Sequence, residues 1–318
     1  MKYILLFLLL HSPFHAHAQS QTIETPKGIF SSHVSHQISK YIHEDHVSGA
    51  LVRVKWSDIE PQEGQFDFTA IERQRQPIIN AEKQWSLAVI AGSHVPSWML
   101  NKTNERMEIT FRRANKQIIP FWSETYQTSA TLLAKAIAKR YGKDPKLVLI
   151  YIPQQTANGI EGHFNGNKTA SLIKQGLTEE NWVGAAKKSI DSFTKAFPNK
   201  AIAIELHELL DSVKIPQSII RYIEYNHRKQ VGIGVWWLSG KTTYQTDLLR
   251  VLQETNLPIY AQVIGKSSQT NRFKNAEYNQ VFHQANIIGA QYVEVWNYEL
   301  EKRVDPSVTN AIIQFSKQ

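Results

Sequence analysis

Eight short apolar segments, distributed over almost the whole chain of 318 residues, constrain its fold more than any other feature. Several are nearly continuous runs, such as LVLIYI at 147–152, a pattern typical of parallel strands that are buried on both faces. Polar, amphipathic stretches separate them. The eight predicted strands are 28–33, 50–56, 86–91, 147–152, 201–206, 231–238, 258–263 and 291–296.

The stretches between these strands have helical periodicity. The predicted helices are 123–141, 179–197, 217–229, 243–254, 275–288 and 306–315. Eight strands alternating with helices in about 300 residues predict a single α/β domain, a (β/α)8 TIM barrel. An open doubly wound sheet is the alternative. It would favour a glycine-rich phosphate turn, but the segment from Gly232 to Trp237 lacks the third glycine of that motif.

The first residues resemble an export signal. Lys2 precedes an apolar run at 4–10, and Ala16-His17-Ala18 provides small residues for cleavage. The run is too short to span a bilayer, although a retained amphipathic anchor is an alternative. We therefore expect a signal peptide at 1–18, a barrel domain at 19–318, a secreted or periplasmic location, and no membrane insertion after cleavage.

Composition excludes several classes of function. The chain has no cysteine, which removes disulfide scaffolds, thiolate metal sites and cysteine nucleophiles. Its 36 basic and 28 acidic side chains form no basic stripe, so nucleic acid is not an expected partner, although a basic surface could favour acidic polysaccharides. The histidine pairs His33/His36 and His43/His46 lack a third ligand at a defining distance. We predict no metal and no cofactor.

Chemistry in such a barrel occurs where the strands end and the following loops begin. These predicted ends are rich in aromatic side chains and carboxylates, which suit the apolar faces and hydroxyls of sugars. The candidate partner is therefore a carbohydrate. Core packing is the alternative for the tryptophans. The candidate sugar-binding residues at the strand ends are His94, Trp98, Gln154, His207, Trp236 and Trp296.

Three segments carry a family resemblance. VRVKWSDIEPQEGQFDF at 52–68 is similar to the W-x-x-x-E-P-x-x-G-x-[FY]-[DN]-[FW] segment of β-galactosidase-type glycoside hydrolases of the retaining (β/α)8 clan. AGSHVPSWM at 91–99 resembles their P-x-W-[LM] segment, and IPFWSETY with the later KRYGKDP resembles the stretch before their fourth strand. The resemblance implies a glycosidase with an acid/base glutamate after strand four and a nucleophilic glutamate at the end of strand seven.

The sequence departs from this family pattern at both positions. Gln154-Gln155 replaces the Asn-Glu pair after strand four, and Gln262 occupies the position of the nucleophile. A glutamine side chain cannot ionise, so it cannot act as a nucleophile or base in the ordinary way. Gln262 is therefore a candidate sugar-binding residue. Arg53 is a charge in an apolar strand, and we expect it to enter the barrel, pair with a carboxylate and contribute to the site.

Three interpretations of the remaining carboxylates stay open. In the first, the chain is a glycosidase in which Glu161 is the acid and Glu294 or Glu205 takes the second role. In the second, it is a carbohydrate-binding barrel without catalysis. In the third, all three glutamates are hydrogen-bonded structural carboxylates, with Arg53 or Lys55 as candidate partners.

Overall fold

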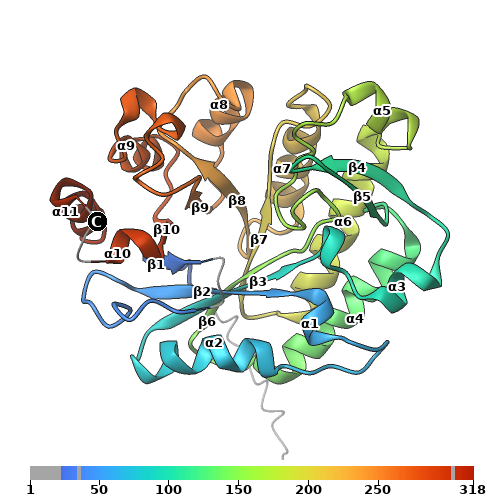
Figure 1. Ribbon diagram of the computed structural model, residues 1–318, viewed down its shortest axis with the longest axis horizontal. Coiled ribbons are helices and arrows are strands. Elements are labelled where there is room, and N and C mark those ends of the chain that lie inside the picture. The colour runs from blue at the N-terminus through green and yellow to red at the C-terminus, as the bar shows by residue number, and fades with distance from the viewer. Residues whose placement is uncertain (1–22, 34–36, 302–304) are drawn as a thin grey trace, which may run out of the picture.

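A computed structural model of the chain describes residues 23–33, 37–301 and 305–318. Eight parallel strands close into a barrel in the order β1-β10-β9-β8-β7-β6-β3-β2 (Figure 1). This confirms the predicted (β/α)8 fold, and the predicted signal peptide at 1–18 lies outside the described residues. The barrel strands are β1 (Gly28–Ser32), β2 (Gly49–Lys55), β3 (Gln84–Ile90), β6 (Leu147–Tyr151), β7 (Ala201–Glu205), β8 (Val231–Leu238), β9 (Ile259–Val263) and β10 (Tyr292–Trp296).

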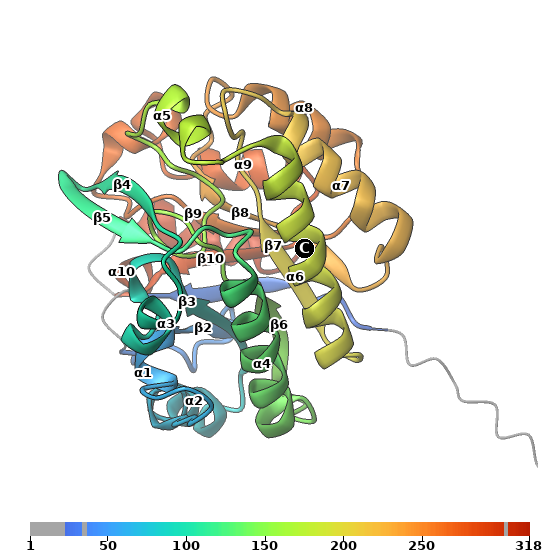
Figure 2. The ribbon, with the colours of Figure 1, turned by 90° about the vertical axis from the view of Figure 1, so that its right-hand side faces the viewer.

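Helices surround the strands on the outside of the barrel (Figures 1 and 2). Within the described residues, no helix combines the length and the apolar character needed to cross a bilayer. The α-helices are α1 (Trp56–Ile59), α2 (Thr69–Asn80), α3 (Ser97–Lys102), α4 (Glu124–Tyr141), α5 (Thr169–Lys174), α6 (Glu179–Ala196), α7 (Lys214–Asn226), α8 (Thr246–Glu254), α9 (Gln280–Ile287), α10 (Asn297–Leu300) and α11 (Pro306–Phe315). The short 3-10 helices in the described residues are η1 (Gly92–His94), η2 (Thr270–Arg272) and η3 (Lys274–Ala276).

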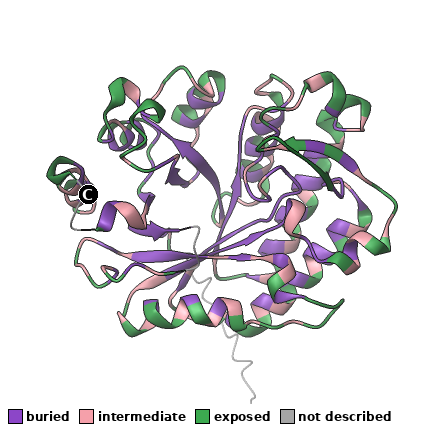
Figure 3. Ribbon diagram, in the orientation of Figure 1, coloured by how far each residue is buried: buried purple, intermediate pink, exposed green. Residues whose placement is uncertain are grey.

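The apolar core has two parts, because each strand places alternate side chains on opposite faces. One cluster contains residues from all eight barrel strands and none from a helix, so it fills the barrel interior; Leu51, Tyr151, Tyr260 and Tyr292 belong to it. The larger cluster lies between the strands and the helices. Both faces of the barrel strands are therefore buried, as Figure 3 shows, and this explains their continuous apolar sequences.

A two-stranded antiparallel hairpin follows the third barrel strand and was not among the predicted elements. It comprises β4 (Met107–Phe111) and β5 (Ala114–Ile118) and lies beside α5 in both views (Figures 1 and 2). Side chains that flank α5 hold it there: Thr110 N donates to Asn167 Oδ1 at 2.7 Å. Its two-residue turn, Arg112-Arg113, has φ of 50° and 67°. Two left-handed residues define a type I′ turn, where Asn-Gly is the usual sequence.

Candidate active site

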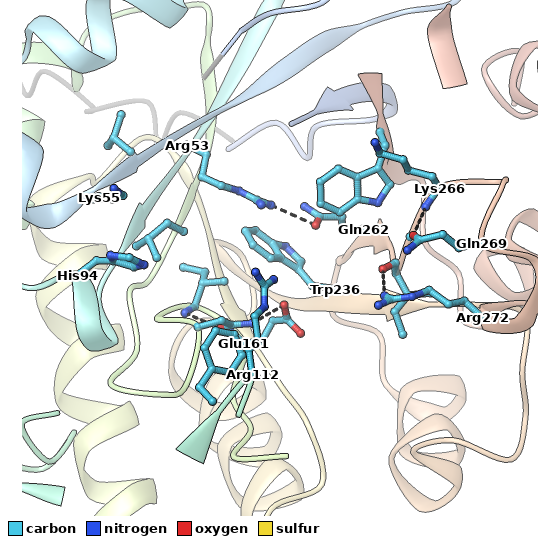
Figure 4. Close-up of a pocket in the computed structure, with 18 residues that line it drawn as sticks. Arg53, Lys55, His94, Arg112, Glu161, Trp236, Gln262, Lys266, Gln269 and Arg272 are labelled. Carbon is cyan, nitrogen blue, oxygen red and sulfur yellow. Dashed lines mark hydrogen bonds between the residues drawn. The ribbon is translucent and has the colours of Figure 1, made fainter. Parts of the chain in front are cut away.

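A cavity of about 460 Å³ opens at the carboxyl end of the barrel (Figure 4). Its volume is in the range of small-ligand sites. The structure thus brings together side chains from β2, β8, β9, β10 and several loops. The predicted site residues that line this cavity are Arg53, His94, Glu161, Trp236, Gln262 and Trp296.

Arg53 enters the barrel from β2, as expected. Its guanidinium lies 4.6 Å from the ring centroid of Trp236 and 5.7 Å from that of Trp296, and it donates to Gln262 Oε1 at 3.1 Å (Figure 4). Burial lowers the pKa of Arg53, while the negative charges of Glu294 and Glu161 act in the opposite direction. The guanidinium is therefore held in a fixed place on the cavity wall.

Glu294 lies beneath Gln262, inside the barrel. The two residues are register partners on β10 and β9, and Gln262 Nε2 donates to Glu294 Oε2. Glu294 Oε1 accepts from the hydroxyls of Tyr151 at 2.9 Å and Tyr292 at 2.7 Å. Burial raises the pKa of Glu294 although these hydrogen bonds, first those from Tyr292 and Gln262, counteract it. Glu294 is completely buried and does not line the cavity.

Glu161 is the carboxylate that lines the cavity among the described residues. Its side chain is 23% exposed, and it accepts from Asn158 Nδ2 at 2.5 Å and faces His163 Nε2 at 3.2 Å. Burial acts to raise the pKa of Glu161, but the hydrogen bond from His163 and nearby positive charges, including Arg53, leave it lowered. Glu161 is therefore ionised at neutral pH.

Two close contacts fix the loop that carries Glu161. Ala91 N donates to Gly159 O at 3.0 Å, which joins this loop to the end of β3. Gly159 has φ +84°, and a Cβ there would lie 2.5 Å from Ala91 O. Only glycine combines this backbone conformation with such a close approach. The loop after β6 is thus attached to the neighbouring strand end.

Glu205 fixes the same loop from the other side. This fully buried carboxylate accepts from Gly162 N at 2.6 Å and from Trp236 N at 3.2 Å. His207 Nδ1 lies 3.0 Å from the carboxylate. Burial raises the pKa of Glu205 well above its usual value and lowers the pKa of His207 to about 3. Both shifts favour the uncharged form of each group.

The remaining predicted sugar-binding residues lie away from the cavity lining. Gln154 is buried, and its Nε2 donates to the carbonyls of Ile160 and Glu205 at 2.7 and 2.9 Å. Trp98 is on α3, where its indole donates to Glu60 O at 3.1 Å and its ring packs against the outer core. His207 packs against the ring of His163, with centroids 4.6 Å apart. The side chains of Gln154, Trp98 and His207, which the sequence suggested as sugar-binding groups, are thus engaged in hydrogen bonds and packing within the protein.

Sequence reasoning missed several basic residues of the cavity: Lys55, Arg112, Lys266 and Arg272. Arg112 could not be placed from the sequence, because nothing in it indicates that the β4–β5 hairpin reaches the cavity mouth. Lys55 could have been found, since it ends β2 two residues after Arg53 and so shares its strand face.

Potential metal-ligand atoms of Glu161, His163 and His207 lie within 4.8 Å of one another. Two histidines and a carboxylate form a common zinc ligand set. Here, however, Asn165 N donates to His163 Nδ1 at 3.1 Å, so the proton is on Nε2, which faces Glu161. A cation bound by this nitrogen would displace that proton and break the hydrogen bond. The three groups fit an internal hydrogen-bond network better than a metal centre.

The fold agrees with solved glycoside-cleaving enzymes at low sequence identity. A β-galactosidase from Bacillus circulans sp. alkalophilus aligns with 12% identity and a TM-score of 0.60, over 92% of this chain and 56% of that one. A cold-adapted β-galactosidase from Rahnella sp. R3 aligns with 12% identity and a TM-score of 0.56, over 92% and 55%. The xylanase 10B of Thermotoga petrophila RKU-1 aligns with 10% identity and a TM-score of 0.52, over 85% and 82%. This chain thus spans just over half the length of the two β-galactosidases.

The sequence itself matches one family. No curated protein matches the chain in sequence. The profile of the glycoside hydrolase 42 family, described as β-galactosidase, matches residues 31–197, slightly more than half of the chain. The match runs from the end of β1 to the end of α6 and includes the segment at 56–68 and the loop with Glu161. The chain therefore belongs to the β-galactosidase family of glycoside hydrolases.

Proposed function

We propose that the chain cleaves a glycosidic bond in the cavity at the barrel mouth, with Glu161 and Glu294 as its two carboxyl groups. The observation that carries the proposal is that their environments move their pKa values in opposite directions, lowered for Glu161 and raised for Glu294. A glycosidase needs one ionised and one protonated carboxyl group. Family membership and the tryptophans of the lining support a carbohydrate substrate.

In this mechanism Glu294 gives its proton to the glycosidic oxygen while the bond from that oxygen to the anomeric carbon breaks. Glu161 either takes a proton from the attacking water or attacks the anomeric carbon itself. This reverses the acid role that the sequence suggested for Glu161, because an ionised carboxylate cannot donate a proton. Proton delivery also requires Gln262 to rotate away from Glu294, which is buried beneath it. Glu205 and His207 then act as positioning residues for the loop.

Turnover of aryl glycosides tests the proposal. We expect hydrolysis of an aryl β-galactoside or β-xyloside, the sugars suggested by the names of the similar enzymes. Glu161→Gln and Glu294→Gln should each lower kcat by about 10²- to 10⁴-fold, the usual effect of losing a general acid or base. Glu124→Gln, an exposed change on α4, is the control and should keep full activity. Full activity in Glu161→Gln would refute the mechanism.

A second candidate is a barrel that binds sugar without cleaving it. Gln262 at the position of the family nucleophile favours it, as does the engagement of both Glu294 oxygens by Gln262 and two tyrosines. In this case calorimetry detects sugar binding, no aryl glycoside is hydrolysed, and Glu161→Gln changes affinity alone. Appearance of turnover in Gln262→Glu would further support this candidate, because the variant restores a carboxyl group beside Arg53.

A further inference from the structure

The cavity has a strongly one-sided charge. Among the residues that the structure describes, five basic side chains line it, against one acidic side chain, Glu161. The whole chain is nearly balanced, so this ratio reflects a local concentration of positive charge. A cavity wall of one sign raises the local concentration of ligands of the opposite sign. The five basic residues are Arg53, Lys55, Arg112, Lys266 and Arg272.

These cations come from three separate parts of the chain. Arg53 and Lys55 are on β2, Arg112 is at the hairpin tip, and Lys266 and Arg272 follow β9 (Figure 4). Within the described part of the chain, four of these residues form no ion pair with an N–O distance of 4.0 Å or less. They are Lys55, Arg112, Lys266 and Arg272. Their charges therefore lack close carboxylate partners, and an anionic ligand would supply one.

The local backbone positions two of these arginines, Arg112 and Arg272. Arg112 occupies a left-handed turn position with φ 50°, which disfavours every residue with a side chain except asparagine and aspartate. Arg272 lies across Gly265, where a Cβ would be 2.7 Å from Arg272 Cδ. Arg272 Nη1 also donates to Ile264 O at 2.7 Å, which directs the guanidinium along the cavity wall. Both arginines are placed by specific local structure.

We propose that the sugar bound in this cavity is anionic and carries a carboxylate, as in a uronic acid, or a sulfate ester. Guanidinium groups bind both anions through paired hydrogen bonds, and tryptophan rings accept the apolar sugar face. The inference rests on the proposed function, since it assigns a substrate class to the same cavity. It concerns binding, so it can be tested without turnover.

Calorimetry on the full chain, with two matched trios of ligands, tests the inference. The ligands are methyl β-galactoside, its uronic acid and its 6-sulfate, together with the glucose-configured trio. We expect at least one acidic ligand to bind about tenfold more tightly than its neutral counterpart at 50 mM NaCl, with the preference reduced at 500 mM. The tighter of the two acidic ligands identifies the anion. Equal affinities within both trios, or no binding by any acidic ligand, would overturn the inference.

Variants of the basic residues show which of them recognise the acidic ligand. Arg112→Gly should weaken binding of the acidic ligand about fivefold and leave the neutral ligand unchanged, and Lys266→Ala/Arg272→Ala should abolish most of the preference. Arg113→Gly is the matched control: it removes the same charge from the same turn, but Arg113 does not line the cavity. Equal losses in Arg112→Gly and Arg113→Gly would contradict recognition within the cavity.

The two proposals fail separately. A chain that binds acidic sugars but hydrolyses no glycoside, acidic or neutral, refutes cleavage and supports the anionic ligand. A chain that hydrolyses neutral aryl glycosides without any preference for acidic sugars refutes the anionic ligand and supports cleavage.

Discussion

Glu205 shows how a buried carboxylate can resemble a catalyst in sequence and act as a structural group. It ends a barrel strand, as catalytic residues of these barrels do. Yet its oxygens accept the backbone N–H groups of Gly162 and Trp236, which have no access to solvent acceptors there. The spacing that places Glu205 at a strand end is visible in the sequence. Its partners come from distant segments, and the sequence does not indicate them.

Two variants of Glu205 separate these roles. Glu205→Gln keeps one of the two acceptor oxygens and replaces the other with a donor group, so we expect it to lose about 1–2 kcal/mol of unfolding free energy at pH 7, less than an alanine variant, and its turnover to persist. Glu205→Ala leaves two buried N–H groups without an acceptor and should lose about 2–4 kcal/mol. Denaturant unfolding and steady-state kinetics measure both. Loss of turnover in a stable Glu205→Gln would instead assign it a catalytic role.

At the scale of elements, the sequence predicts strands that are continuous apolar runs and misses the hairpin that tertiary contacts stabilise. All eight barrel strands were predicted to within two residues, because burial on both faces leaves long apolar runs, as in β8. The β4–β5 hairpin was missed, because β5 is exposed at all but its last residue and has the polar run Asn115-Lys116-Gln117 at its centre. Bonds to side chains near α5 stabilise it, and these depend on tertiary structure.

The loop after β6 provides a test at this scale. We expect Gly159→Ala to lose about 1–3 kcal/mol of stability and to weaken sugar binding, because the new Cβ collides with Ala91 O and displaces the loop that carries Glu161. Gly166→Ala is the control: Gly166 has φ +90°, but a Cβ there has no atom within 4 Å. Unfolding and calorimetry compare the two. Equal effects on sugar affinity would show that the contact with Ala91 is unimportant.

For the whole molecule, the neutral Glu205–His207 pair predicts how stability depends on pH. Because the pKa of Glu205 is raised and that of His207 is lowered, we expect the folded pair to hold one proton, on Glu205, between pH 4.5 and 6.5, where the unfolded chain also holds one, on His207. The contributions of Glu205 and His207 to the slope of unfolding free energy against pH therefore cancel. Replacing either residue should therefore expose the pH dependence of stability that the remaining residue causes.

The expected slopes have opposite signs. In Glu205→Gln, His207 binds a proton below pH 6.5 in the unfolded chain but stays neutral in the folded one. Stability therefore falls as pH decreases from 6.5, by up to about 1.4 kcal/mol per pH unit. In His207→Gln, the folded state keeps a proton on Glu205 that the unfolded state releases, so stability falls as pH rises above 4.5. Urea unfolding at pH 5 and 6, relative to wild type, measures this. Slopes of the same sign would contradict a neutral pair.

The attachment of the Glu161 loop to Glu205 limits how this protein can be recombined with its relatives. The family match ends at residue 197, before β7 begins, so a chimera joined there would take its loop from one parent and its β7 anchor from another. Gly162 N would then face whatever side chain the second parent places at position 205. A chimera of this chain with a relative should therefore be joined beyond Trp236. The loop, Glu205 and Trp236 then come from the same parent.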